Sequence, residues 1–262
     1  MLLTDRRGPV LTLTLDRPET RNALSADLVT ALTAALATAA ADGSVRVVVL
    51  AGSGSVFSAG ADLGALRALR DASYADNLAD SERLGRLFEA ILRHPKPVVA
   101  RVHGHAVAGG CGLAAACDFQ IAADTATFGF SEVRIGFVPA LVATFVTRKV
   151  GEAAARSLFL RGHRIPAAEA ARIGLVTEAV PAGDLDARVA ALCAELATET
   201  SPSAVALTKT LLADLPGKTL SEALAHAAAV NASARATPDC RAGVDAFLDR
   251  TDPPWRRSGD DV

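Results

Sequence analysis

The chain has 262 residues, a formal net charge of −2 and 50% hydrophobic residues, enough for one large domain or for a domain with an appendage. The near-neutral charge, the scattered Lys and Arg and an aromatic content of 4% argue against a nucleic-acid-binding surface. The sequence contains no run of about 18 apolar residues, so it predicts no membrane-spanning helix. The first ten residues, MLLTDRRGPV, place their charges after a very short apolar run, the wrong order for a signal peptide.

The cysteine pattern is that of reduced thiols. Cys111, Cys117, Cys193 and Cys240 show no CxxC spacing, and Cys111 and Cys117 lie in a small-residue stretch typical of a packed core. We therefore expect no metal site and a cytoplasmic location.

Strands and helices alternate from the start of the chain. Alternating Leu and Thr over residues 10–15 predict a half-buried strand. Ser25 is a candidate N-cap for a helix with Leu28, Leu32 and Leu36 on one face. Beyond Asp42-Gly43 the predicted elements are a buried strand, a long helix and two further buried strands, over residues 45–50, about 74–93, 98–102 and 118–123.

Helical patterns dominate from about residue 140, with one short predicted strand at 175–180. Ser201-Pro202 and Thr237-Pro238 each match an N-cap followed by proline at the first helical position. The sequence thus predicts an α/β core over residues 1–195 and a C-terminal helical region over 196–262.

Two glycine-rich loops, at residues 51–63 and 103–112, each follow a β-branched strand and precede a helix. Unpaired backbone N–H groups and the helix dipole at such a junction can hold an anion or a developing oxyanion. A dinucleotide-binding loop is a weaker interpretation, because Phe57 replaces the third glycine of GxGxxG. One such loop alone would more often only turn the chain, but two favour a shared site.

Five segments in series resemble the enoyl-CoA hydratase/isomerase family, which has the crotonase fold. They are DRPETRNALS (16–25), VFSAGADL (56–63), HPKPVVARVHGHAVAGGCGLAAACD (94–118), ATFGFSEVRIGFVP (126–139) and AARIGLVTEAV (170–180). The resemblance implies an α/β spiral of ββα units with a C-terminal helical trimerisation region, assembled as a homotrimer or a dimer of trimers. It implies an acyl-CoA substrate and no separate cofactor, since CoA is part of the substrate.

The resemblance also assigns residues to a site. The backbone N–H groups of Ala61 and Gly109 would hold the thioester oxygen as it gains negative charge. Coenzyme A would lie along five residues in the first quarter of the chain: Arg21, Ala23, Ala59, Asp62 and Leu63. Phe247 and Arg250 match C-terminal positions that reach CoA in relatives, sometimes across a subunit boundary.

Glu132, in FGFSE, is the catalytic carboxylate that the resemblance implies. The alternative is a solvated surface charge, but Phe128, Phe130, Val133 and Ile135 predict an apolar wall that would raise its pKa.

Hydratases of this family commonly use a second glutamate, and its position here is Gly112. Nearby polar residues are His103, His105, Asp118 and Asp124. A lone loop histidine is more often structural, and Asp118 fits a role in capping or pairing with the backbone.

Several functions remain open at this point. GGCGLAAACD with SEVRIGFVPA resembles a branch of the family that hydrates branched or glutaconyl-type CoA esters, and this resemblance implies a hydratase that adds water across C2=C3 of such a 2-enoyl-CoA. The chemistry of a single carboxylate instead favours an isomerase that moves a proton between C2 and C4 of a 3-enoyl thioester, because hydration also needs an oriented water. A non-catalytic acyl-CoA binder is the third hypothesis. Asp71, Asp76 and Asp80 would disfavour an acidic acyl tail if they faced the pocket.

Overall fold

The computed structural model describes residues 1–256, except for the side chains of Leu63, Ala65, Leu66 and Leu69. Its strands form two sheets. The predicted contact of the Leu63 side chain with CoA therefore lies outside the described residues.

The larger sheet has six strands in the order β1-β2-β3-β5-β7-β10. Only the β1–β2 pair is antiparallel, and the other neighbours are parallel. The strands are β1 (Leu2–Arg7), β2 (Val10–Leu15), β3 (Val47–Gly52), β5 (Val98–Val102), β7 (Phe119–Ala123) and β10 (Glu178–Val180).

The smaller sheet has four strands in the order β4-β6-β8-β9. Its first three strands run parallel, and β9 is antiparallel to β8. The strands are β4 (Val56–Ser58), β6 (His105–Val107), β8 (Thr127–Gly129) and β9 (Arg164–Pro166). Each parallel strand of this sheet closely follows a strand of the larger sheet in the chain, which brings the loops after β4, β6 and β8 to one edge.

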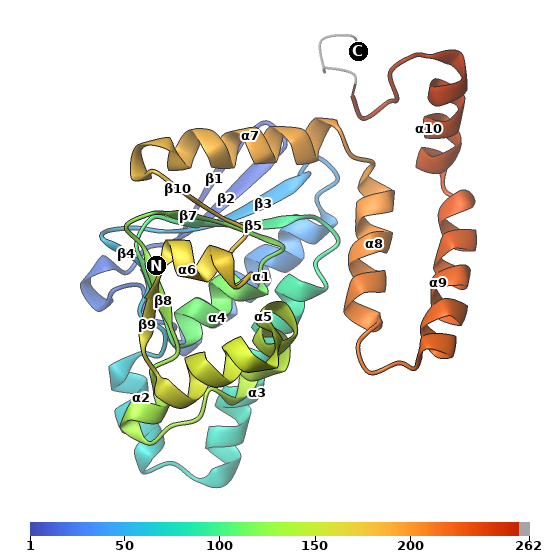
Figure 1. Cartoon of the computed structure of the whole chain (residues 1–262). Helices are drawn as coiled ribbons and strands as arrows, with labels where there is room; N and C mark the ends of the chain where they lie inside the picture. Colours follow the sequence, from blue (N-terminus) through green and yellow to red (C-terminus); the bar gives the residue numbers. More distant parts are fainter. Residues whose placement is uncertain (257–262) are drawn as a thin grey trace.

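Helices cover both faces of the six-stranded sheet, with α7 on one side and α1, α3 and α4 on the other (Figure 1). The helices are α1 (Ala26–Ala41), α2 (Leu63–Arg70), α3 (Tyr74–Leu92), α4 (Gly109–Ala116), α5 (Ala140–Arg161), α6 (Ala167–Arg172), α7 (Leu185–Thr198), α8 (Pro202–Asp214), α9 (Leu220–Arg235) and α10 (Pro238–Asp249). Short 3₁₀ turns are η1 (Pro18–Thr20), η2 (Glu132–Ile135) and η3 (Ala182–Asp184).

The continuous apolar run of β3 follows from this two-sided cover. Val48 and Leu50 belong to the core under α1, α3 and α4, whereas Val47 and Val49 pack with α7 on the other face. A parallel strand buried on both faces has no polar side to alternate with. The run therefore identified a central strand correctly.

Most predicted elements are present. Ser25, Ser201 and Thr237 each accept a backbone N–H as the N-cap of α1, α8 and α10, and proline occupies the first turn of α8 and α10. Strand β3 begins two residues later than predicted. The strand predicted over 175–180 is shorter, because the N–H groups of Leu175 and Val176 both bond the carbonyl oxygen of Ala170 in the turn after α6.

Strand β1 was not predicted. Its residues are mostly exposed, so Leu2–Arg7 carries no alternation of apolar and polar side chains. It forms because Gly8, with a φ of +56°, turns the chain back onto β2.

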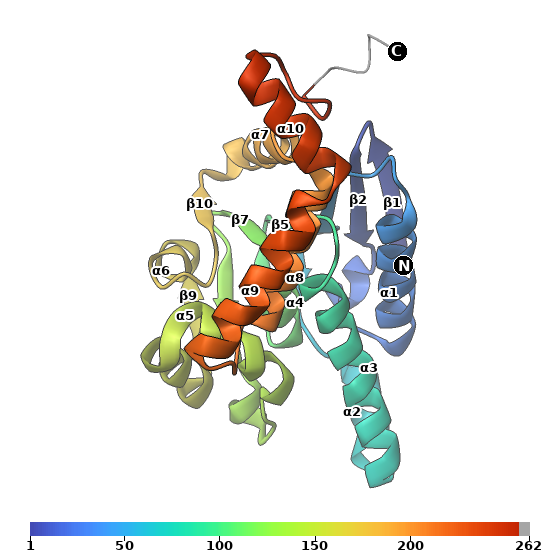
Figure 2. The ribbon, with the colours of Figure 1, turned by 90° about the vertical axis from the view of Figure 1, so that its right-hand side faces the viewer.

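The C-terminal helices extend away from the sheets, with α8 and α9 side by side and α10 continuing beyond α9 (Figures 1 and 2). Helix α8 is tied to the core by Lys209, whose ammonium group pairs with Asp118 and donates to the carbonyl oxygen of Lys96 at 3.2 Å. Helix α9 has no buried residue. The C-terminal region is therefore anchored at α8 and open beyond it.

Candidate active site

The two glycine-rich loops meet where β4 and β6 end. A Cβ atom placed on Gly60 would lie 2.7 Å from the carbonyl oxygen of Val107 and 3.0 Å from the amide nitrogen of Gly109. Gly60 also has a φ of +87°, which L side chains rarely adopt. Only glycine at this position lets the second loop approach so closely.

Within the described chain, neither the N–H of Ala61 nor that of Gly109 has a hydrogen-bond acceptor. Gly109 is the first residue of α4, so its N–H belongs to the positive end of that helix. The residue before it, Ala108, has a φ of +51° and a ψ of −129°. Such a conformation costs an alanine about 1–3 kcal/mol, and strain of this kind concentrates at functional sites.

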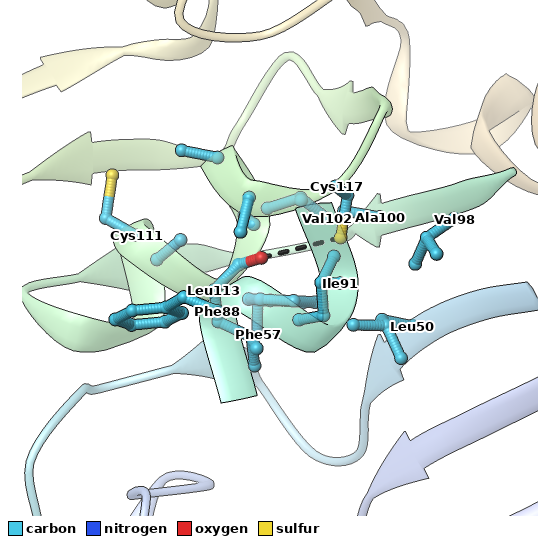
Figure 3. Packing of buried hydrophobic residues seen from close by; sticks show 14 of the residues in the cluster. Leu50, Phe57, Phe88, Ile91, Val98, Ala100, Val102, Cys111, Leu113 and Cys117 are labelled. Carbon is cyan, nitrogen blue, oxygen red and sulfur yellow. Dashed lines mark hydrogen bonds between the residues drawn. The ribbon is translucent and has the colours of Figure 1, made fainter. Parts of the chain in front are cut away.

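Helix α4 is almost entirely enclosed. Every residue after Gly109 is buried, and Figure 3 shows Cys111, Leu113 and Cys117 among Phe57, Phe88 and Ile91. At its other end, Lys149 Nζ lies 3.4 Å from the carbonyl oxygen of Ala115, and burial lowers the pKa of this lysine. The helix is thus a fixed support for the free N–H at its start.

Glu132 opens η2, three residues after the end of β8, and β8 pairs with β6. Its Oε2 is buried and has no hydrogen-bond partner in the described chain. Burial raises the pKa of Glu132, and the charge of this carboxylate adds to the burial that raises the pKa of the Cys111 thiol. Glu132 is therefore a partly desolvated acid whose charge is felt at Cys111 of α4, and its Oε2 accepts no hydrogen bond among the described residues.

The apolar wall predicted around Glu132 is present only in part. Phe128 and Phe130 are buried, whereas Ile135 is 72% exposed and Val133 is also exposed. Val133 and Ile135 lie within the 3₁₀ turn rather than in a strand or a buried helix, so their side chains leave the core.

Gly112 has no room for a side chain. A Cβ atom at this position would overlap Val142 Cγ1 and lie 3.3 Å from Phe88 Cζ. Val142 is a buried residue of α5, and it occupies the space where a second glutamate would begin. No local pattern in the sequence marks Val142, because its contact with Gly112 arises only when α5 packs on α4.

Most of the N-terminal residues expected along CoA gather beside the first loop. The N–H of Ala59 donates to the carbonyl oxygen of Arg21 at 2.9 Å, and the N–H of Leu24 donates to that of Gly60 at 2.7 Å. Ala23, between them, is buried. The segment after η1 therefore runs alongside the loop that carries Ala61.

Asp62 is engaged in an ion pair that sequence reasoning missed. Arg17 Nη1 lies 3.1 Å from Asp62 Oδ2 and donates to the carbonyl oxygen of Ala23 at 3.0 Å. Both charged side chains are largely buried, and the DRP motif gave no sign of this contact.

Phe247 and Arg250 are not brought to this site within one chain. Phe247 is 83% exposed on α10, and Arg250 ends the same helix in a left-handed conformation. In both ribbon views α10 lies at the opposite end of the molecule from α2 (Figures 1 and 2).

Three of the other polar candidates, His103, His105 and Asp118, have structural partners. His103 Nε2 lies 3.0 Å from the carbonyl oxygen of Gly54, and His105 Nδ1 lies 2.9 Å from Thr127 Oγ1. Asp118 accepts from the N–H of Val98 at 2.7 Å and pairs with Lys209, as the backbone-pairing interpretation expected. Among the described residues, no group of three or more His, Cys, Asp or Glu could hold a metal ion.

None of the described helices is long and apolar enough to cross a membrane.

Residues 5–258 match the family model described as enoyl-CoA hydratase/isomerase. A protein of Thermus thermophilus named as an enoyl-CoA hydratase is 43% identical, over 94% of this chain and 97% of its own. The 2,3-dehydroadipyl-CoA hydratase of Escherichia coli is 34% identical, over 97% and 98%.

A crystal structure of enoyl-CoA hydratase from Mycobacterium smegmatis superposes with a TM-score of 0.91 at 37% identity, covering 98% of this chain and 99% of the other. The crotonase-type fold expected from the sequence is thereby confirmed. With a family match that spans nearly its whole length, the chain belongs to the enoyl-CoA hydratase/isomerase family.

Proposed function

We propose that this protein is an enoyl-CoA hydratase in which Glu132 acts as the only catalytic carboxylate. The observation that carries the proposal is the buried, unpartnered Oε2 of Glu132 beside the strand edge where the N–H groups of Ala61 and Gly109 are free. A buried carboxyl oxygen without a partner and two N–H donors without acceptors among the described residues fit a site that stabilises charge on a thioester oxygen.

The reaction needs one proton to leave water and one to reach C2. The Glu132 carboxylate takes a proton from water as the water oxygen bonds to C3. Electrons of the C2=C3 bond then move toward the thioester oxygen, which the N–H groups of Ala61 and Gly109 stabilise. The carboxyl group returns a proton to C2, so it ends as it began and the product is a 3-hydroxyacyl-CoA. The raised pKa of Glu132 suits a group that both accepts and donates.

An isomerase is the second candidate, and the filled space at Gly112 favours it. Because Val142 occupies the place of a second carboxylate, no acidic side chain at position 112 can orient water. Moving a proton from C4 to C2 of a 3-enoyl-CoA requires only one base that becomes the acid. The relatives named as hydratases favour hydration, so we retain isomerisation as the alternative.

A branched or glutaconyl-type acyl group is our proposal for the substrate. The three aspartates that would oppose an acidic tail are already engaged: Asp71 with Arg70, Asp76 with the Ser73 hydroxyl and Asp80 with Arg83. The arginine partners of Asp71 and Asp80 weaken the objection that these two carboxylates would repel such a tail. The similarity to the 2,3-dehydroadipyl-CoA hydratase supports an acyl group that ends in a carboxylate.

The test compares three CoA esters on the purified protein. Crotonyl-CoA and 3-methylglutaconyl-CoA should lose their conjugated absorbance, with faster loss for the second, and a 3-enoyl-CoA should gain none. Glu132→Gln should lower kcat by about 10³-fold or more, since general acid–base groups contribute about 10²–10⁴-fold. Glu152→Gln is the matched control, because that exposed glutamate pairs only with Arg156. Full activity in Glu132→Gln would refute the assignment, and a gain of absorbance from the 3-enoyl ester would favour the isomerase.

We further propose that the chain assembles as a homotrimer, or as a dimer of trimers, through its C-terminal helices. Exposed apolar side chains on α9 and α10 support this assembly: Leu220, Leu224, Val244, Phe247 and Leu248. Assembly would also allow Phe247 and Arg250 to reach a CoA moiety bound by a neighbouring chain.

A further inference from the structure

Ser58 lies between the two loops that carry the proposed oxyanion donors. It ends β4 and is fully buried. Its Oγ donates to the carbonyl oxygen of Asn22 at 2.8 Å and accepts from the N–H of Gly60 at 3.2 Å. One hydroxyl group therefore joins the N-terminal segment to the residue immediately before Ala61.

The same serine also touches the second loop. A Cβ atom on Gly110 would lie 2.5 Å from the carbonyl oxygen of Ser58 and 2.6 Å from its Oγ. Glycine at position 110 lets α4 begin directly against Ser58. Ser58 thus contacts the residue before one donor and the residue after the other.

Asn22 holds Ser58 from behind. Its side chain is fully buried, and its Nδ2 donates to the carbonyl oxygens of Ser53 at 2.8 Å and Val56 at 3.0 Å. Its Oδ1 accepts from the N–H of Arg17 at 2.9 Å, and its own φ is +54°. A buried amide with both ends engaged fixes its backbone, and with it the carbonyl oxygen that Ser58 bonds.

We propose that Ser58, fixed by Asn22, is a positioning residue that sets the separation of the Ala61 and Gly109 N–H groups. This inference rests on the proposed function, because those two groups are the proposed donors. The Ser58 hydroxyl is fully buried and both of its hydrogen bonds go to the backbone, so its effect would reach the substrate through the two donors. It acts on the rate because a donor displaced by about 1 Å stabilises the developing oxyanion poorly, at a cost of about 10²-fold.

The test uses Ser58→Ala, which removes both hydrogen bonds and leaves the Cβ in place. We expect kcat for a 2-enoyl-CoA to fall about 10- to 100-fold while KM changes less than about threefold, since ground-state binding of CoA is spared. A second readout is the absorption of a bound 2,4-dienoyl-CoA. Polarisation of its carbonyl by both donors shifts the band to longer wavelength, and Ser58→Ala should reduce that shift.

Thr177→Val is the matched control. Its hydroxyl accepts from the N–H of Gln120 at 3.0 Å beside the larger sheet, away from the loops. It should leave kcat and the absorption shift unchanged. Gly110→Ala gives an independent test from the opposite side, because its new Cβ would press on Ser58 without removing a hydrogen-bonding group.

The outcomes separate this inference from the proposed function. Wild-type kcat and an unreduced shift in Ser58→Ala would overturn the positioning role even where Glu132→Gln is inactive. Equal losses in Ser58→Ala and Thr177→Val would also overturn it, as would failure of both Ser58→Ala and Gly110→Ala to fold, because the role is then structural. Absence of turnover in the wild-type protein would instead refute the proposed function.

Discussion

Helices α4 and α9 are both rich in alanine but differ in how much of their surface is buried. Every residue of α4 after Gly109 is buried, whereas no residue of α9 is. Helix α4 packs against β4 and β6 of the smaller sheet and against α3 and α5, so its surface is buried within one chain. Helix α9 contacts only its neighbours α8 and α10 substantially, and it leaves large apolar side chains exposed. Helix α4 is thus buried within one chain, whereas α9 would be covered by another chain only in the assembly that we propose.

One methyl group added at Gly112 should disrupt the tight packing of α4 against Val142. Gly112→Ala should lower the free energy of unfolding by about 3 kcal/mol, because its Cβ would overlap Val142 Cγ1 in a core that cannot expand freely. Denaturant unfolding measures the effect. Gly85→Ala is the control, since its Cβ would meet Leu141 Cδ2 at an ordinary 3.7 Å, and a helical Gly→Ala change should stabilise by about 0.5–1 kcal/mol.

Val142→Ala should relieve Gly112→Ala when the two are combined. Residues in direct contact show coupling energies of about 0.5–3 kcal/mol, so the double variant should be more stable than the sum of the single changes. Strict additivity would contradict the close contact between these positions.

The exposed apolar side chains of α9 and α10 predict the next largest effect, which is on the association of chains rather than on folding. Leu224→Ser with Phe247→Ser should weaken assembly by about 2 kcal/mol or more, roughly 30-fold in the dissociation constant. Sedimentation velocity should show smaller particles. Leu3→Ser, at an exposed position on β1, is the control and should leave the sedimentation coefficient unchanged. Unchanged assembly in the double variant would place the interface elsewhere.

The smallest predicted effect is the pH dependence of stability that Glu132 causes beside α4. Burial raises the pKa of Glu132 above its ordinary value of 4.5, so the folded chain holds this proton more tightly than the unfolded chain does. The ionised form is therefore penalised by folding, and stability is lost as the pH rises from about 4.5 through the folded pKa.

Glu132→Gln removes this penalty. It should be more stable than the wild type at neutral pH, by less than about 1 kcal/mol because the site is partly solvated, and equal to it below pH 4.5. Thermal unfolding at several pH values measures the difference. A constant difference across that range would show that Glu132 titrates normally.

The sequence predicted what depends on neighbouring residues. The caps at Ser25, Ser201 and Thr237 need only a hydroxyl three residues before a backbone N–H, and the buried strand β3 needs only an unbroken apolar run. The two glycine-rich loops, at residues 51–63 and 103–112, were also identified from their own residues and the strands that precede them. The placement of Glu132 and Gly112 came from the family resemblance.

What the sequence left out depends on contacts between distant segments. Val142 is an ordinary helical valine until α5 lies on α4, and the ion pair of Arg17 with Asp62 joins positions 45 residues apart. The partial error at Val133 and Ile135 has the same origin, because apolar residues near a predicted acid indicate a wall only when the backbone turns them inward.

The Gly112–Val142 contact also constrains how this site could change over many generations. A carboxylate gained at position 112 arrives where Val142 leaves no space, and a smaller residue gained first at 142 leaves an empty hollow beside Phe88. Either order passes through a less stable protein, by about 1–3 kcal/mol for overpacking and a comparable amount for the hollow. A lineage that gained an acidic group at position 112 would therefore need a pair of coupled substitutions. A family tree should show the residues at these two positions changing together.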